Sequence, residues 1–100
     1  MSIGDDYYQS GKFDKAIHYY LLAAEKNNLK AQLTLAYIYY NDKDIQKAIQ
    51  YYELAAEQDD LNAQLSLAQI YNTGNYIERD INKVIHYCSL AAEKMIWKHN

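Results

Sequence analysis

The sequence predicts an all-α fold of about three stacked helix–turn–helix repeats, the first of them truncated. Two blocks recur along the chain. Residues 47–57 have counterparts at 15–25 and 83–93, at spacings of 32 and 36 residues. Residues 31–39 match residues 63–71, again at a spacing of 32. Self-similarity at such a period is typical of stacked repeat proteins, in which each repeat covers the apolar face of its neighbour.

The composition agrees with a folded helical chain. Half of the residues are hydrophobic and 23% are charged, which suits a chain with a packed core. Proline is absent and only three glycines occur, as helices prefer, because both residues weaken helix interiors. The hundred residues are enough for one domain, residues 1–100. Twelve tyrosines supply ring area with a polar tip for a core margin or a binding surface.

Charge and hydropathy exclude several classes of function. The net charge of −3 argues against binding to nucleic acid or to an anionic membrane surface. No apolar run approaches the ~20 residues that span a bilayer, and the acidic residues 1–6 do not resemble a signal peptide. Cys88 is the single cysteine, so no internal disulfide can form. We therefore expect a cytoplasmic location, although an excised soluble domain would have the same composition.

Each repeat contains two helices, called A and B. In an A helix the apolar residues recur at i, i+4, i+5 and i+8 and form one stripe: Ala31, Leu35, Ala36 and Tyr39. In a B helix the corresponding stripe contains Ala48, Ile49, Tyr52, Ala55 and Ala56. Both stripes have the period of a helix and predict an antiparallel helix pair in each repeat.

The helices are expected, in chain order, at residues 2–9, 13–26, 29–40, 44–58, 61–71 and 81–94. The first is short because the repeat register places Gly4 at the position of Ala36 and Ala68. Gly11 is expected to end that first helix as a C-cap residue. Three helix N-caps are predicted at Asp44, Asp60 and Asp80.

The repeats accordingly cover about residues 2–27, 28–59 and 60–94. The turn at 72–79 is four residues longer than the others. The tail, residues 95–100, does not match an A helix; we expect it to prolong the last helix and to lay Trp97 over the end of the stack.

Small residues are predicted to set the distance between the helices. Ala36, Ala68 and Gly4 are expected to face Ala16, Ala48 and Val84, so that the helix axes approach to the short end of the ~8–10 Å range. Larger residues are expected to fill the space between repeats: Leu35, Tyr39, Tyr52, Leu54 and Leu67.

The repeated blocks resemble Sel1-like repeats, a branch of the tetratricopeptide-type helical repeats. The residues that carry the resemblance are Lys47-Ala48-Ile49, Tyr51-Tyr52, Ala55-Ala56-Glu57-Gln58, Ala63-Gln64, Leu67-Ala68 and Tyr71. The longer third turn is similar to the family's usual connection. The chain departs from the pattern by alanine instead of glycine at positions 36 and 68, by two short turns, and by its single cysteine. The resemblance implies a right-handed superhelix that acts as an adaptor in protein complexes, without catalysis or a cofactor.

In this architecture the A helices line the concave face. We expect the A-helix positions outside the packing stripe to bind a protein or peptide, because tyrosines give rigid contact area and amides hydrogen-bond a peptide backbone. The alternative is that these positions are merely solvated, with Leu33 and Leu65 partly packed. The positions are Asp5, Tyr8, Gln9, Lys30, Leu33, Tyr37, Tyr40, Asn41, Asn62, Leu65, Gln69 and Asn72.

The residues that could carry chemistry are better explained structurally. His18 and His86 occupy equivalent positions and lack the spacing of a metal site, so we expect surface histidines and no metal. Cys88 stands where the other repeats have Tyr20 and Tyr52, and we expect a small buried residue there. A catalytic cysteine would need a histidine partner, and a histidine two positions away on a helix points elsewhere. The acidic pairs at 5–6 and 59–60 lie at helix starts, which favour acids.

The sequence therefore favours a non-catalytic interaction module. The alternative is a regulatory or recruiting segment of a larger, enzyme-containing protein or complex, and direct hydrolysis by Cys88 is a more distant third. Neither end of the array has a polar capping helix, which stacked repeats need for solubility. We therefore expect either a fragment of a longer array or self-association through the open ends.

Overall fold

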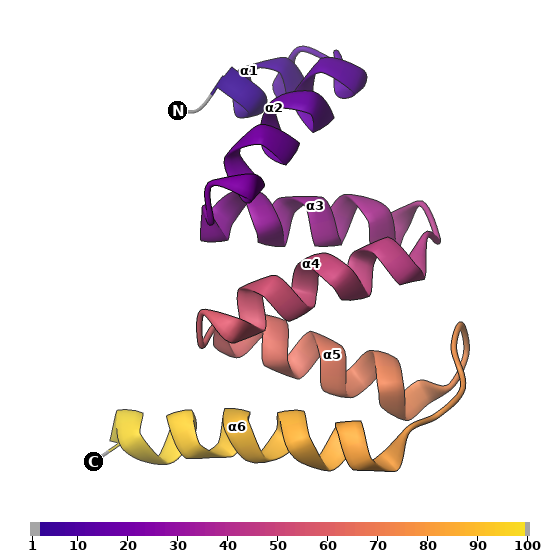
Figure 1. Cartoon of the computed structure of the whole chain (residues 1–100), viewed down its shortest axis with the longest axis vertical. Coiled ribbons are helices and arrows are strands. Elements are labelled where there is room, and N and C mark those ends of the chain that lie inside the picture. Colours follow the sequence, from indigo (N-terminus) through magenta and orange to yellow (C-terminus); the bar gives the residue numbers. More distant parts are fainter. Residues whose placement is uncertain (1–2, 100) are drawn as a thin grey trace.

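The computed structural model describes residues 3–99, with side chains described for residues 3–96. It contains six helices and, within this part of the chain, no strand. In chain order (Figure 1) they are α1 (Ile3–Gln9), α2 (Phe13–Glu25), α3 (Leu29–Asn41), α4 (Ile45–Glu57), α5 (Leu61–Thr73) and α6 (Ile81–His99). The all-α prediction is thus confirmed. The last helix continues through the tail as expected, whereas the predicted place of the Trp97 side chain lies outside the described side chains.

The helices stack in chain order and reverse direction at each turn. Each helix packs against its neighbours in sequence, both within a pair (α1 with α2, α3 with α4, α5 with α6) and between pairs (α2 with α3, α4 with α5). Figure 1 shows α1 and α6 at opposite ends of the stack. This arrangement is a helical repeat solenoid, in which each element covers only its neighbours.

Local sequence signals explain where the helices begin. The predicted N-caps Asp44, Asp60 and Asp80 each accept a hydrogen bond from the backbone amide three residues on, at 3.4, 2.8 and 3.2 Å. Asn28 caps α3 in the same way, accepting from the Ala31 amide at 2.9 Å. These bonds satisfy amides that have no partner inside the helix.

Left-handed residues separate the helices. Gly11 (φ 81°) follows α1, as predicted for a residue that ends a helix. Asn27 (φ 66°) and Asp59 (φ 69°) occupy equivalent places between the repeats. Non-glycine residues seldom adopt this conformation, and Asn and Asp are the ones that tolerate it best.

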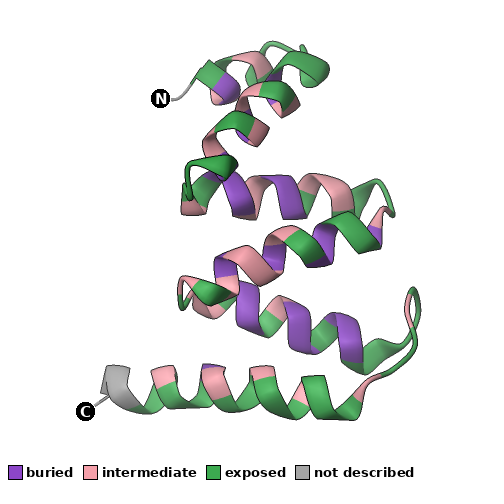
Figure 2. Ribbon diagram, in the orientation of Figure 1, coloured by how far each residue is buried: buried purple, intermediate pink, exposed green. Residues whose placement is uncertain are grey.

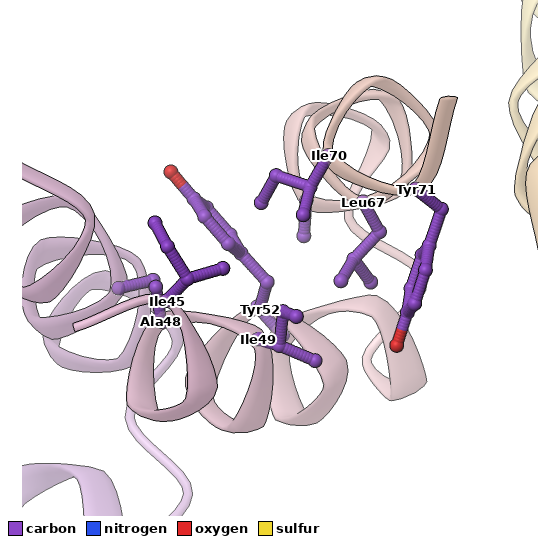
Figure 3. Packing of buried hydrophobic residues seen from close by; sticks show 10 residues of the cluster. Ile45, Ala48, Ile49, Tyr52, Leu67, Ile70 and Tyr71 are labelled. Carbon is purple, nitrogen blue, oxygen red and sulfur yellow. The ribbon is translucent and has the colours of Figure 1, made fainter. Parts of the chain in front are cut away.

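The core follows the predicted stripes. Ala36 and Ala48 are fully buried, Ala68 is 6% exposed, and the two leucines beside the alanines, Leu35 and Leu67, are fully buried. Figure 2 shows the buried residues along α3, α4 and α5, and Figure 3 shows how Ile49, Tyr52 and Leu67 meet between α4 and α5. The alanines expected at the helix contacts are therefore buried, as predicted.

The first repeat is packed closely at its glycine. A Cβ added at Gly4 would come within 2.9 Å of the Tyr20 ring, closer than such atoms approach in proteins. Tyr20 is itself 5% exposed. The position that the repeat register aligns, Gly4, Ala36 or Ala68, is thus buried in all three repeats.

A tyrosine pair, with a lysine over one ring, recurs in each repeat. A tyrosine on the A helix stacks on one from the B helix, with ring centroids 5.4, 5.9 and 6.4 Å apart in the pairs Tyr7–Tyr19, Tyr39–Tyr51 and Tyr71–Tyr87. The lysine that begins each repeated block, Lys15, Lys47 or Lys83, lies 5.6, 5.2 or 4.8 Å from the A-helix ring. Stacked rings and a cation over a ring both favour this geometry.

The expectation that Cys88 is buried was wrong. Its counterpart Tyr52 is covered by the next A helix, α5, whereas no helix of the described chain covers the same face of α6. Cys88 is therefore exposed. The repeat register identified the right position, but the position is buried only where another repeat follows.

A candidate protein-binding hollow between α3 and α5

A hollow of about 340 Å³ opens between the two A helices of the second and third repeats. It gathers four residues of the predicted site, three from α3 and one from α5: Tyr37, Tyr40, Asn41 and Gln69. Ser66 and Ile70 of α5 and Tyr52 of α4 complete its lining. The residues come together because α3 and α5 both pack on α4, so that their outward positions face the same space.

Tyr52 contributes a buried ring to this hollow. The residue is 9% exposed, and Figure 3 shows its ring beside Ile70, with the phenol oxygen directed away from α4. Burial raises the pKa of the Tyr52 phenol, and a hydrogen bond with Ser66 opposes that rise. The hydroxyl therefore stays neutral at physiological pH and can donate as well as accept a hydrogen bond.

The rim of the hollow is aromatic. Tyr37 is 60% exposed, and Tyr40 lies edge-on to Tyr76, with ring centroids 6.2 Å apart. Tyr76 belongs to the long turn between α5 and α6, is itself exposed, and was not among the predicted site residues. The length of the turn could have pointed to Tyr76. Its four extra residues allow the turn to reach back toward the end of α3.

The hollow has an uncharged lining. The sequence of α5 contains no charged residue, and Lys30 is the single charged residue of α3. The polar groups of the lining are hydroxyls and amides, which offer both donors and acceptors. Such a surface favours uncharged polar and apolar groups over ions.

The predicted residues Asp5 and Lys30 lie elsewhere and bind each other. Lys30 Nζ is 3.0 Å from Asp5 Oδ2, and the Tyr20 hydroxyl donates to Asp5 Oδ1 at 2.6 Å. Burial, together with the hydrogen bond to Asp5, raises the pKa of the Tyr20 phenol above its ordinary range. This cluster lines a smaller hollow of about 210 Å³ at the first repeat, and its contacts are those of a structural link between α1, α2 and α3.

Tyr8 lines a third hollow, of about 390 Å³, with Phe13, Ile17 and Ile38. Its ring lies edge-on to Phe13, with centroids 5.2 Å apart. Asn41 is the one predicted residue that lines both this hollow and the one between α3 and α5.

The other predicted residues do not gather into one site. Asn72 accepts a hydrogen bond from Arg79 at 3.1 Å. Leu33 is half-buried and packs against the core, whereas Leu65 is 44% exposed on α5. Asn62 and Gln9 are exposed, the first near the start of α5 and the second at the end of α1.

The described part of the chain holds no group of three or more histidine, cysteine or acidic side chains that could bind a metal ion. His18 and His86 are exposed, and each packs edge-on against the tyrosine that follows it. Among residues 3–99, no helix has the length and apolar character to cross a membrane.

The fold and its recurring helix contacts define a helical repeat protein, and comparison with known proteins identifies the family. The tetratricopeptide repeat model matches residues 1–63, and the Sel1 repeat model matches residues 61–94. The chain therefore belongs to the tetratricopeptide-type family of helical repeats, with Sel1-like repeats. Proteins built from such repeats generally mediate protein–protein interactions and are typically non-catalytic.

A Sel1 repeat protein from Oxalobacter formigenes has a similar solved structure. The two share 30% sequence identity with a TM-score of 0.71 over 91% of this chain. The chain spans 40% of the length of that protein. No curated protein has significant similarity to the sequence.

Proposed function

We propose that the chain is a non-catalytic adaptor that binds an extended, uncharged segment of a partner protein in the hollow between α3 and α5. The observation that carries the proposal is the convergence of Tyr37, Tyr40 and Gln69 from two repeats around one 340 Å³ space. That volume lies at the small end of ligand pockets and suits one or two side chains of a peptide. The general role of the repeat family supports a protein as the partner.

The lining suggests how the segment is held. An apolar side chain of the partner enters between Tyr37 and Tyr40 and packs on Ile70 and the Tyr52 ring. The amides of Asn41 and Gln69 then hydrogen-bond the peptide backbone beside it. Exposed tyrosine rings lose little conformational entropy on binding, which makes them frequent hot spots of interfaces.

The absence of charge in the lining predicts the composition of the partner. A carboxylate or an ammonium group placed in the hollow would lose hydration without gaining an ionic partner. Selection from a displayed random-peptide library on the immobilised chain should therefore enrich apolar residues flanked by uncharged ones. Enrichment of acidic or basic motifs would contradict the proposed chemistry.

The selected peptides allow a matched comparison of variants. Tyr37→Ala and Tyr40→Ala each remove one rim ring, and we expect each to weaken binding at least about tenfold in a fluorescence anisotropy titration. Tyr8→Ala removes an exposed ring from the third hollow and should leave the affinity unchanged. The proposal fails if the rim variants bind like the wild type, or if Tyr8→Ala is the variant that loses binding.

A second candidate is a recruiting or regulatory role inside a larger protein. It is favoured by one observation, namely that the chain spans 40% of the similar Sel1 repeat protein. In that case the hollow would bind a segment of the same larger chain or complex. A larger natural protein or complex that contains the chain would then not bind the free peptide, whereas under the first candidate it would.

A further inference from the structure

The outward face of α6 carries an uncovered apolar stripe. Its members lie along one side of the helix and are all exposed: Ile81, Ile85, Cys88, Ala92, Met95 and Ile96. We call them the α6 stripe. Ile85 is 59% exposed and Ile96 61% exposed. Among the α6 residues whose side chains are described, only Ala91 is buried, and Figure 2 shows the exposed surface along most of this terminal helix.

The first half of this stripe has buried counterparts in the preceding repeat. Ile45 and Ile49 of α4 correspond to Ile81 and Ile85, and they are 5% and 9% exposed beneath α5. The α6 stripe thus has the composition of a helix–helix interface. A row of large apolar side chains on one face marks an interaction site more often than a solvated surface.

The turn by which α5 comes to cover α4 has no counterpart at the end of the α6 stripe. The turns between earlier repeats contain Asn27-Asn28 and Asp59-Asp60, which end one helix and cap the next. Met95 and Ile96 stand at those positions in the third repeat, and α6 continues past them to His99. With these turn residues replaced, α6 continues where α4 ends, and the two apolar residues lengthen the stripe.

We propose that the α6 stripe binds the α6 stripe of a second copy of the chain, antiparallel and about a twofold axis close to Cys88. The stripe has large residues at both ends and small ones, Cys88 and Ala92, in its middle. Antiparallel pairing about this centre sets Ile81 against the Ile96 position and Ile85 against the small Ala92 position. The large Ile85 side chain of each copy then meets the small Ala92 of the other, as close helix packing requires, and the isoleucines at the two ends pack on each other.

The charges beside the α6 stripe and the area of the stripe both agree with a second copy of the chain as the partner. Polar residues follow one edge of the stripe, and the antiparallel pairing brings the Glu93 carboxylate of one copy near the His86 imidazole of the other, so that no like charges oppose. Its four large aliphatic side chains are 48–61% exposed, so two stripes that face each other bury on the order of 1,000 Å², the lower end of a specific interface. A weak, isologous dimer is therefore expected, the commonest form of self-association.

The single cysteine makes a direct test possible. The unmodified chain should sediment, as its concentration is raised, toward twice the 11.7 kDa of one chain. At those concentrations a short bis-maleimide should link two copies through Cys88. Ile85→Asp should abolish both the dimer and the cross-link, with the helical circular dichroism unchanged. Leu22→Asp, which charges another exposed aliphatic position, should leave both intact.

The other mode of association is head-to-tail, with α1 of one copy on α6 of the next. It would involve Ile3, whose counterpart Leu35 is fully buried, and it would build open chains of more than two copies. It gives no cross-link, because α1 contains no cysteine. Species larger than dimers that Ile3→Asp abolishes would overturn the proposal. A strict monomer at all concentrations, without a Cys88 cross-link, would overturn it equally.

Discussion

Gln58 donates a hydrogen bond from its side-chain amide to the carbonyl oxygen of the buried Gln32 side chain, at 2.7 Å. The same Nε2 group lies 3.1 Å from the Asn27 backbone oxygen. Gln32 in turn donates to the Ala24 carbonyl oxygen at 3.3 Å. One amide pair thus connects the end of α4, the start of α3 and the turn after α2. Buried amides need such partners because an unmade hydrogen bond is costly there.

The third repeat lacks the equivalent bond. Gln64, the counterpart of Gln32, is 1% exposed, and its Oε1 has no hydrogen-bond partner among the described residues. Lys94 stands where Gln58 would be and instead pairs with Asp59 at 3.3 Å. A buried acceptor without a donor lowers the stability of the folded state.

The first prediction is that Lys94→Gln stabilises the protein. A glutamine there can donate to Gln64 Oε1, and the lost ion pair is exposed on the Asp59 side and so contributes little. We expect the free energy of unfolding to rise by about 1 kcal/mol, measured by urea denaturation. Lys26→Gln is the control, since it changes the equivalent position of the first repeat, where no paired glutamine exists. An unchanged or lower stability of Lys94→Gln would contradict the comparison of the two repeats.

The second prediction concerns the helix contact at Ala68. Ala68→Leu inserts a larger side chain where the residue is 6% exposed, and we expect it to lower the free energy of unfolding by about 1–3 kcal/mol. Gln69→Leu adds a similar side chain at the next, exposed position of α5 and should change the stability far less. Equal effects of the two variants in urea denaturation would show that close approach at Ala68 is not what limits the packing.

The third prediction is a loss of stability at high pH. Burial and the hydrogen bond to Asp5 raise the pKa of the Tyr20 phenol above its ordinary 10.0. A raised pKa means that the unfolded chain loses this proton first, so the stabilisation is complete below pH 10 and declines as the pH rises further. Tyr51, Tyr52 and Tyr87 also have raised pKa values and act in the same direction.

Tyr20→Phe tests this linkage. The variant removes the titrating group but keeps the ring, so its stability should decline less steeply above pH 10 than that of the wild type, in urea denaturation at several pH values. Tyr76→Phe, in an exposed turn, serves as the control and should reproduce the wild-type slope. Identical slopes for all three proteins would mean that the Tyr20 phenol is not protected.

The fourth prediction follows from the exposure of Cys88. A chromogenic thiol reagent should modify the native chain at high dilution about as fast as it modifies the chain unfolded in urea. Modification that requires unfolding first would place the thiol in the core, as the sequence alone had suggested. Cys88→Ser should remove the signal entirely, since the sequence has no other cysteine.

The sequence was informative wherever a contact repeats. Ala36 and Ala68 were predicted to be buried because matched positions recur at a fixed spacing, and Asp60 was predicted as an N-cap from its place before an apolar stripe. Periodicity and capping are local properties, so one chain carries enough information to predict them.

Contacts that depend on how distant helices are placed could not be predicted. The ion pair between Asp5 and Lys30, two residues expected to bind a partner, joins positions 25 residues apart in sequence and was not predicted. Tyr8 was grouped with Tyr37 because both are outward A-helix positions, and the shorter first helix places it in another hollow. Cys88 was predicted to be buried because it aligns with Tyr20 and Tyr52. Both of those residues are covered by a following repeat. Predicting these contacts requires the relative positions of three helices. A local sequence pattern carries no information about those positions.

The most direct test of the proposed binding site is a residue-resolved map of peptide contact. A peptide selected from the random library, titrated into the isotope-labelled chain, should shift the amide resonances of residues 37–41 and 66–70 and leave those of α2 unchanged. Shifts confined to residues 8–17, or spread evenly over all six helices, would contradict the assignment of the hollow between α3 and α5 as the place where a partner binds.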